Sequence, residues 1–309
     1  MSKLPISVII LTYNEEKNIE ECLKSVYGWV EEIFIVDSYS TDKTLEIAKK
    51  YTDKIYQHEF ETHTKQWQWA LKTLPVISDW IFGLDADQRV SIELKRELES
   101  LFSNNLTDVD GVYVSRRQIF LGRWIKYGGY YPKYLLKIFK KDKVFFDESD
   151  YVDHHFYVKG KTIILKSDII EDNVKERDSS FWLKKHIKYA ELHAMEFLMP
   201  LNKKINPSFA GSPDERTLFL KNIYQRLPLF IRPFLYFFHR YFFRLGFLDG
   251  KEGLIFHFLQ GFWYRFLVDA KIYEIEKRAR VENRPIQEII NEFLMSMKQE
   301  RGQEKIENR

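Results

Sequence analysis

Three short polar segments in the N-terminal third of the chain carry side chains that could bind a phosphate or a metal ion. Thr12-Tyr13-Asn14-Glu15 follows one apolar, β-branched run, Asp37-Ser38 follows a second, and Asp85-Ala86-Asp87 follows a third. Open parallel α/β sheets bind their ligands at the carboxyl ends of the strands. We therefore expect the three segments to share one edge of a sheet and to form one site.

Asp85 and Asp87 are the candidate metal ligands. Two carboxylates on a short turn offer hard oxygens, and Mg²⁺ or Mn²⁺ commonly combines one or two carboxylates with water and phosphate oxygens. Such an ion would offset the charge of a diphosphate and stabilise it as a leaving group. The alternative is that Asp87 caps a predicted helix over 91–101. Asp85 directly follows a buried strand, where an unpaired carboxylate is costly, and this favours the metal.

The elements that must position these segments alternate between strands and helices. Apolar runs and capping residues predict strands over 6–12, 32–37, 54–57 and 80–84, and helices over 16–27, 42–51, 64–74 and 91–101. This order predicts an α/β fold with a mostly parallel, Rossmann-like sheet and helices on both faces.

A glycine-rich loop at 128–132 lies between two later predicted strands, over 111–115 and 134–139. Glycines let a backbone approach a ligand closely, and Tyr130 and Tyr131 could stack on sugar rings. A tight connection with two packed tyrosines is the alternative.

From Asp178 onward the sequence predicts helices, and the first of them places Leu183, Ile187, Ala190, Ala194 and Phe197 on one face. Residues 228–266 mix Phe and Tyr with arginines around almost the whole helix circumference, as in helices that lie in a membrane interface. Packing on the core or in a homo-oligomer is the alternative. Charges interrupt the apolar runs well short of the ~20 residues that a membrane span needs, so no transmembrane helix is predicted.

The composition is that of a folded protein, with 45% hydrophobic and 30% charged residues among 309. The net charge of +3 and the lack of a compact basic patch in the N-terminal half argue against nucleic acid as a partner. The single Cys22 excludes an intramolecular disulfide and suits a reducing compartment. No leader with an apolar core and a small-residue cleavage site opens the chain, so we expect a cytoplasmic location.

Several segments together resemble the family 2 glycosyltransferases, which have a GT-A fold, and in particular the bacterial branch that contains lipopolysaccharide-core β-glucosyltransferases. They are Ser7–Glu16, Val36–Thr44, Leu84–Asp87, Phe120–Gly122, Gly128–Pro132 and Leu245–Gly253. The resemblance extends from residue 6 to about 275. It implies a GT-A domain over 1–175, with a nucleotide-sugar half over about 1–110 and an acceptor half over about 111–175. A helical region over 176–309 would follow.

The resemblance also implies an inverting reaction. An acceptor hydroxyl, deprotonated by a general base, attacks the anomeric carbon of a nucleotide sugar as the nucleotide diphosphate leaves. The implied nucleotide-sugar residues are Thr12, Tyr13 and Glu15 for the nucleoside, Asp37 for a uracil-type base, Lys65 and Gln66 for the base or diphosphate, and Asp85 for the ribose or diphosphate, with Asp87 on the metal. The residues expected to border the acceptor cleft are Arg116, Arg117, Tyr130 and Tyr131.

The sequence departs from the family at several places, of which three bear on the nucleotide site and the base. Trp67 stands where relatives usually have Arg, and Gln88 stands where they commonly have Glu. Val152–His155 replaces the Val-His-Glu segment that supplies the presumed base. A His can act as a general base near neutral pH, so the base candidates, in order, are His154, Asp153 and Asp150. Glu171 or Asp172 could orient His154, although drifted surface polar groups would give the same pattern.

The predicted function is a metal-assisted, inverting hexosyltransferase. It would use Mg²⁺ or Mn²⁺ and a UDP-activated sugar, peripherally at the inner face of the cytoplasmic membrane, with a lipid-linked saccharide or lipopolysaccharide-type glycan as acceptor. One alternative is a polyprenyl-phosphate sugar synthase, in which phosphate itself attacks and no strong base is required. Another is a non-catalytic, nucleotide-binding subunit of a polysaccharide assembly complex.

Overall fold

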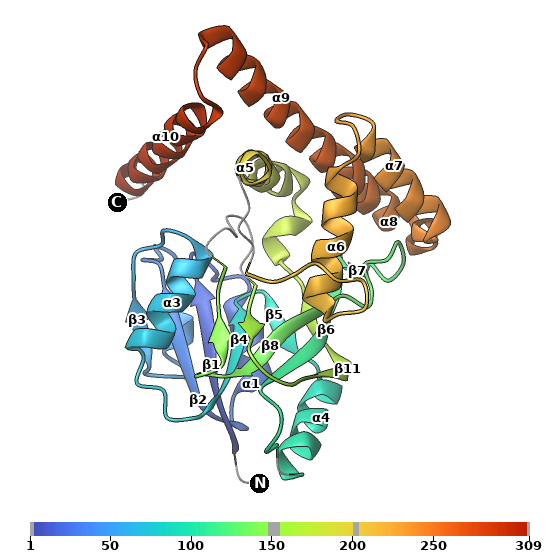
Figure 1. Cartoon of the computed structure of the whole chain (residues 1–309). Helices are drawn as coiled ribbons and strands as arrows, with labels where there is room; N and C mark the ends of the chain where they lie inside the picture. The colour runs from blue at the N-terminus through green and yellow to red at the C-terminus, as the bar shows by residue number, and fades with distance from the viewer. Residues whose placement is uncertain (1–2, 105, 148–154, 200–203, 308–309) are drawn as a thin grey trace.

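The computed structural model of this protein describes residues 3–104, 106–147, 155–199 and 204–307. A mixed α/β part is followed by a helical part (Figure 1). The strands are β1 Leu4–Thr12, β2 Val30–Asp37, β3 Ile55–Gln57, β4 Trp80–Asp85, β5 Gln88–Val90, β6 Gly111–Phe120, β7 Arg123–Trp124, β8 Tyr134–Lys140, β9 Val144–Phe145, β10 Tyr157–Val158 and β11 Thr162–Glu171. The helices among them are α1 Ile19–Val26, α2 Thr44–Ala48, α3 His63–Thr73 and α4 Ile92–Ser103.

The main sheet has the strand order β3-β2-β1-β4-β8-β6-β11-β5. The first four strands are parallel, as expected of strands joined by helical crossovers. Beyond β4 the sheet is mixed, because β8 runs antiparallel to both β4 and β6, whereas β11 runs parallel to β6. The long strand β11 and the short strand β5 that pairs with it were not expected from the sequence. The predicted α/β class with a helical C-terminal region is confirmed.

Alternate residues of β1 explain why helices cover both faces of the sheet. Val8 and Ile10 are fully buried in a cluster with α1, α2 and α4. Ile9 points the other way and packs with Trp67 and Ala70 of α3. A strand with both faces covered reads as a continuous apolar run, which is how β1 appears in the sequence.

The C-terminal part is a set of helices that gather at the end of the sheet away from the N-terminus (Figure 1). They are η1 Val174–Arg177, α5 Ser179–Leu198, α6 Pro213–Gln225, α7 Arg232–Phe238, η2 His239–Phe243, η3 Gly246–Asp249, α8 Gly250–Phe256, η4 His257–Trp263, α9 Tyr264–Glu282 and α10 Ile286–Glu307. Because β1 begins near the N-terminus, this is the end at which the parallel strands finish.

Two apolar clusters hold the helices in place. Met195 of α5 packs against Ile272 of α9 and Ile290 of α10. Trp182 of α5 and Phe256 of α8 pack against Phe120 at the end of β6. The second cluster attaches the helical part to the sheet.

The predicted apolar face of α5 is confirmed at Ala190 and Ala194, which are fully buried, but it is wrong at one position. Ile187, expected on the buried face, is 41% exposed. Trp182 and His186 are buried in its place, with their rings stacked 3.5 Å apart.

Candidate functional site

The strand register brings the three polar segments to one edge of the sheet. Thr12 at the end of β1 pairs with Asp37 at the end of β2. On the other side of β1, Leu11 pairs with Asp85 at the end of β4. The predicted convergence of the segments is therefore present in the structure.

Hydrogen bonds between loops fix the segments that follow β1 and β2. The backbone N–H of Asn14 donates to the Ser40 hydroxyl (2.8 Å), and the N–H of Thr41 donates to the Asn14 side chain (2.8 Å). The N–H of Glu15 donates to the Thr44 hydroxyl (2.7 Å). Asn14 has a φ of 52°, a left-handed conformation that Asn tolerates better than most residues. The two loops thus behave as one unit.

Asp87 and Glu15 belong to one hydrogen-bonded network. Asn173 donates to the Asp87 carboxylate (3.1 Å). Asn18 donates both to the Asn173 side-chain oxygen (3.1 Å) and to the Glu15 carboxylate (2.7 Å). Lys175 forms an ion pair with the other oxygen of Glu15. Neither Asn173 nor Lys175 was singled out in the sequence, where the only signal is an Asx residue before a predicted helix.

The carboxylate of Asp87 is available for a ligand. Ser91, not Asp87, caps α4, because its hydroxyl accepts from the N–H of Leu94 (3.1 Å). Burial raises the pKa of Asp87 well above its ordinary value, and the neighbouring carboxylates of Glu171 and Asp85 raise it further. Asp87 is still partly exposed. The cap interpretation is excluded, and the environment disfavours an isolated negative charge.

Asp85 has a cationic partner that the sequence analysis missed. The ammonium of Lys137 on β8 lies 3.0 Å from the Asp85 carboxylate, and Lys137 is only 4% exposed. The backbone N–H of Asp85 donates to the Gln88 side chain (3.2 Å). A lysine inside the apolar run Leu135–Phe139 was the available signal, since lysine is rarely buried without a partner.

The residues present fit a divalent ion held mainly by Asp87. Among the described residues, no Lys or Arg forms an ion pair with Asp87, and no group of three or more His, Cys, Asp and Glu side chains could hold a metal. One or two carboxylates are enough when a diphosphate and water complete the coordination. Lys137 already offsets the charge of Asp85, so Asp87 is the better-suited ligand.

Other predicted nucleotide residues differ in their accessibility. Tyr13 is 46% exposed at the end of β1, whereas Thr12 is buried. Asp37 is fully buried, and its carboxylate accepts hydrogen bonds from Ser40 and Gln57 (2.9 and 3.0 Å). Its place in the structure is to shape the loop that follows β2.

Two of the three residues 65–67 in the first turns of α3 have buried side chains. Gln66 is buried and bonds the His58 ring (2.7 Å) and the Ser38 hydroxyl (3.3 Å). Lys65 is exposed and forms an ion pair with Glu61. Trp67, which stands where relatives usually have Arg, is fully buried against Phe156, with ring centres 4.8 Å apart, so it is a core residue.

The predicted acceptor residues fall into two groups. Arg117 and Tyr131 share the buried carboxylate of Asp168, at 2.7 and 2.8 Å. Arg117 also lies over the Trp124 ring at 4.5 Å. Arg116 forms an ion pair with Glu171 (3.2 Å), whose charge acts on Asp87. Arg116 therefore connects the predicted acceptor residues, through Glu171, to the candidate metal ligand Asp87.

The loop at 128–132 is held by the C-terminal helices. The Asp249 carboxylate accepts from the backbone N–H groups of Lys126 and Tyr127 (3.1 and 2.9 Å). The N–H of Gly128 donates to the Arg244 carbonyl (2.9 Å). Tyr130 packs against Phe256, with ring centres 4.7 Å apart.

The candidate bases Asp150, Asp153 and His154 lie outside the described residues. Their proposed orienting partners are engaged elsewhere. Glu171 accepts from Gln88 (2.9 Å) besides pairing with Arg116. Asp172 pairs with Arg89 and Arg177 (2.7 and 3.1 Å). The identity of the base stays a prediction.

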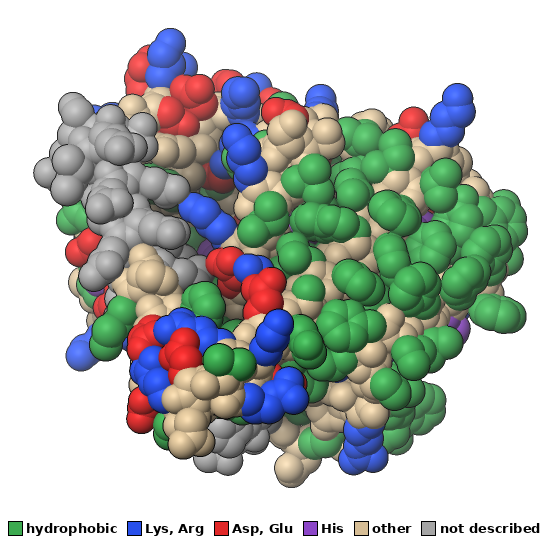
Figure 2. Space-filling model, turned by 90° about the horizontal axis from the view of Figure 1, so that it is seen from above, with side chains coloured by type: hydrophobic (Ala, Val, Ile, Leu, Met, Phe, Trp, Pro, Cys, Tyr) green, Lys and Arg blue, Asp and Glu red, His purple; other side chains and the backbone are tan. Residues whose placement is uncertain are grey.

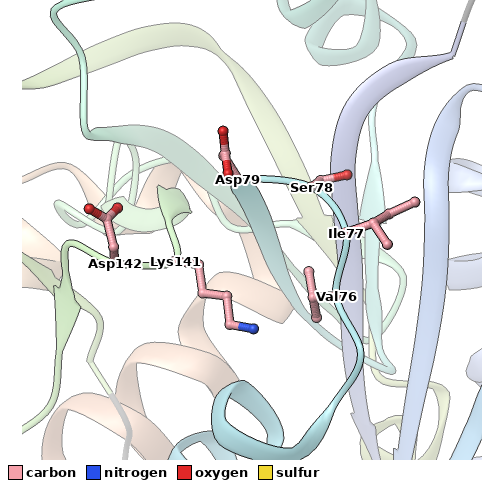
Figure 3. A pocket seen from close by; sticks show the side chains of 6 residues that line it. All are labelled: Val76, Ile77, Ser78, Asp79, Lys141 and Asp142. Atoms are coloured by element: carbon pink, nitrogen blue, oxygen red, sulfur yellow. The ribbon is translucent and has the colours of Figure 1, made fainter.

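Two surface hollows differ in their relation to the site. One of about 210 Å³ lies beside Asp87 and is lined by Asn18, Arg89 and Arg177, among others. A larger one of about 390 Å³ lies between the loop before β4 and the turn after β8, near Val76 and Lys141 (Figure 3). The larger hollow is at the amino end of β4, opposite Asp85, where a parallel sheet does not place its ligand.

The chain is similar in sequence to several known glycosyltransferases. A 34% identical match over 103 residues links the chain to an uncharacterized glycosyltransferase of Rickettsia typhi and covers 33% of this chain and 35% of that protein. The chain thus spans about a third of the length of that relative. A 25% identical match covers 88% of this chain and 93% of the lipopolysaccharide core biosynthesis glycosyltransferase LpsC of Rhizobium meliloti.

Among solved structures, TarS of S. aureus in complex with UDP is 18% identical, with a TM-score of 0.41 over 92% of both chains. The model of the glycosyl transferase family 2 matches residues 7–163, just over half of the chain. That stretch contains every predicted nucleotide and metal residue. This chain belongs to glycosyl transferase family 2, and the predicted family is confirmed.

Proposed function

We propose that this protein is an inverting glycosyltransferase that moves a sugar from a UDP-sugar to a lipid-linked saccharide, with the help of Mg²⁺ or Mn²⁺. The observation that carries the proposal is the convergence of Glu15, Asp37 and Asp87 at one sheet edge of a family 2 chain. A bound divalent ion would offset the charge that develops on the leaving diphosphate.

The residues of the chain have distinct tasks in this proposal. Asp87 holds the ion, and Asn173 orients its carboxylate. Lys137 offsets the charge of Asp85, so that the diphosphate meets one uncompensated carboxylate and not two. The exposed Tyr13 lies where a nucleoside would pass over the end of β1.

The chemical step balances in a single displacement. The acceptor hydroxyl oxygen bonds to the anomeric carbon as the bond from that carbon to the diphosphate oxygen breaks, and the electron pair leaves with UDP. The hydroxyl proton passes to the general base, for which His154 is the first candidate, before Asp153 and Asp150. We expect His154→Ala to abolish sugar transfer and to leave UDP affinity unchanged.

Calorimetry with UDP and Mn²⁺ tests the site. We expect Asp87→Asn to weaken UDP binding in Mn²⁺ by about tenfold or more. Asp79→Asn is the matched control, because Asp79 lies just before β4, at its other end, beside the larger hollow (Figure 3). Asp87→Asn that binds UDP and Mn²⁺ as tightly as wild type would contradict the metal assignment.

Release of UDP from UDP-sugars tests turnover. A donor screen in which none of the sugars yields UDP, from a protein that binds UDP and Mn²⁺, would favour the non-catalytic alternative. Release with water or a saccharide acceptor would support the proposed enzyme.

The same proposal places the helical region at the inner face of the cytoplasmic membrane. Figure 2 looks onto the helical end and shows hydrophobic side chains spread over much of this face. Phe238 and Leu235 of α7 are 50% exposed, and Phe243 of η2 is 79% exposed. Isolated exposed apolar residues are ordinary, but a continuous apolar surface of this kind marks contact with a membrane or a protein.

A membrane is the better-supported occupant because arginines accompany the rings. Arg244 is exposed next to Phe243, as expected where cations meet anionic headgroups. No helix in the described part of the chain combines the length and apolar character needed to cross a bilayer. A second copy of the chain is the remaining candidate, and a dimer in solution without vesicle binding would favour it.

A further inference from the structure

Two arginines of the helical region meet around tyrosine rings beside the 128–132 loop. The Arg240 guanidinium lies 4.3 Å from the ring centre of Tyr130 and 4.7 Å from that of Tyr236. The Arg265 guanidinium lies 4.5 Å from the same Tyr236 ring. We call Tyr130, Tyr236, Arg240 and Arg265 the arginine–tyrosine cluster.

The cluster contains two positive charges and no matching negative one. In the described part of the chain, neither Arg240 nor Arg265 forms an ion pair with a carboxylate. Arg232 of the same region shows the contrast, because it is buried and lies 2.8 Å from the Asp269 carboxylate. Among the described residues, Arg240 and Arg265 have no such carboxylate, because Arg240 donates to the carbonyl oxygen of Gly128 (2.8 Å) and Arg265 lies against the rings of Tyr224 and Tyr236.

Two further observations show that the cluster favours an anion. The Nε–H of Arg265 is buried and has no hydrogen-bond acceptor, a cost that a bound anion would remove. Burial raises the pKa of Tyr236, but Arg240 and Arg265 outweigh burial and hold this pKa below its ordinary value. Arg240 and Arg265 both keep part of their surface exposed to solvent.

The cluster lies between the exposed apolar surface and the metal side of the site. Tyr236 is on α7, whose Phe238 is 50% exposed, and Arg240 is on η2, which follows directly. On the other side, Arg116 is close enough to Tyr130 to oppose the rise that burial causes in the pKa of Tyr130. Arg116 in turn pairs with Glu171, which acts on Asp87.

We propose that the arginine–tyrosine cluster binds the phosphate group that joins the saccharide of the acceptor to its lipid. This assignment rests on the proposed function and names one part of the acceptor. With the lipid at the exposed aromatic side chains and the phosphate at Arg240 and Arg265, the saccharide extends past Tyr130 toward Asp87. Arginine suits this task because its planar fork of N–H groups matches phosphate oxygens.

Vesicle co-sedimentation tests the proposal with three lipid compositions. They are phosphatidylcholine alone, phosphatidylcholine with phosphatidylglycerol, and phosphatidylcholine with polyprenyl phosphate at the same mole fraction. We expect Arg240→Gln to weaken binding to the polyprenyl phosphate vesicles by about tenfold, the loss of one charge-assisted contact. Arg240→Lys keeps the charge and is expected to retain most of the binding. Lys251→Gln removes an exposed charge from α8 and serves as the control.

The outcomes separate this inference from the proposed function. Equal binding of wild type and Arg240→Gln to polyprenyl phosphate vesicles would overturn the inference, as would equal losses on phosphatidylglycerol and polyprenyl phosphate vesicles. UDP and Mn²⁺ binding, measured on the same proteins, is expected to be unchanged by Arg240→Gln. Failure of wild type to bind UDP would count against the proposed function and not against the cluster. Thermal unfolding of each variant shows that it is folded, and Arg265→Gln provides a second test of the cluster.

Discussion

The buried ring of His257 occupies the space that a side chain at Gly128 would need. A Cβ at Gly128 would lie 1.9 Å from the Cε1 atom of His257, and Gly128 has a φ of 69°, which also favours glycine. The first residue of the Gly-Gly-Tyr-Tyr-Pro loop is therefore a glycine because a helix from the other half of the chain packs on it.

Gly128→Ala is expected to lower the free energy of unfolding by about 2 kcal/mol or more, through the clash and the left-handed backbone. Chemical denaturation followed by circular dichroism measures the change. Gly128→Ala combined with His257→Ala should recover the part that is due to the clash. Gly122→Ala is the control, because Gly122 has a φ of 80° and open space around its Cβ position. If Gly128→Ala costs no more than Gly122→Ala, the two residues are not in contact.

His257 also predicts a pH dependence of stability. Its ring is fully buried, and burial together with the nearby charge of Arg240 lowers its pKa from 6.5 to about 4. The other groups that face it are Asp249, 3.9 Å away, and the rings of Tyr130 and Tyr241. The unfolded chain binds a proton to this His near pH 6.5, whereas the folded chain does so only near pH 4. Above pH 6.5 His257 therefore does not change the free energy of unfolding with pH. As the pH drops from 6.5 to 4, the free energy of unfolding falls.

The loss from His257 alone should approach ~3 kcal/mol at pH 4. Unfolding measured between pH 7 and pH 4 on wild type and on His257→Phe isolates this part, since carboxylates contribute equally to both proteins. Parallel pH profiles for the two proteins would show that folding does not lower the pKa of His257.

Lys137→Met tests the partner of Asp85. Without the ammonium 3.0 Å away, the Asp85 carboxylate has lost its cation, and we expect the free energy of unfolding to fall by about 2 kcal/mol. A ligand that brings Mn²⁺ to this edge should restore part of the loss, so UDP with Mn²⁺ should raise the melting temperature of Lys137→Met more than that of wild type. Lys141, which is partly exposed and lies at the other end of β4, provides the control Lys141→Met. If UDP with Mn²⁺ raises the melting temperature of wild type and Lys137→Met equally, Lys137 does not affect ligand binding at this site.

Phe243→Asp tests the apolar surface of the helical end. If the 79% exposed Phe243 enters a bilayer, replacing it by a carboxylate should weaken binding to phosphatidylglycerol-containing vesicles by about tenfold or more. Ile77→Asp is the matched control, because Ile77 is 71% exposed but lies before β4, away from the helical end. Similar vesicle binding by both variants would leave a second copy of the chain as the occupant of this surface.

Local sequence patterns predicted the parts of the molecule that depend on local order. The apolar run of β1 and the acidic pair that follows β4 are sufficient to place Asp85 and Asp87 at the ligand edge of a parallel sheet. Lys137 was missed because its partner is 52 positions away in the chain, and only the fold brings the two together. The prediction that Ile187 lies on the buried face of α5 was wrong. The stacked rings of Trp182 and His186 are buried instead, and a pattern of apolar residues does not predict the burial of a histidine.

The arginine–tyrosine cluster could not be predicted from local sequence patterns. Tyr130 and Arg265 are more than a hundred positions apart, and a run of mixed aromatic and basic residues does not show which arginines pair with carboxylates. Arg232 and Arg240 look alike in the sequence, yet one has Asp269 as its partner and the other faces tyrosine rings.

Asp249 has a consequence for any attempt to exchange parts between members of this family. Its carboxylate completes the hydrogen bonding of Lys126 and Tyr127, more than a hundred residues earlier in the chain. The 128–132 loop therefore depends on a distant part of the chain for its conformation. A chimera that carries only the first 175 residues of this chain would bring the loop without the group that fixes its backbone. A transplant of acceptor preference would need to move Gly246–Asp249 and α8 together with the loop.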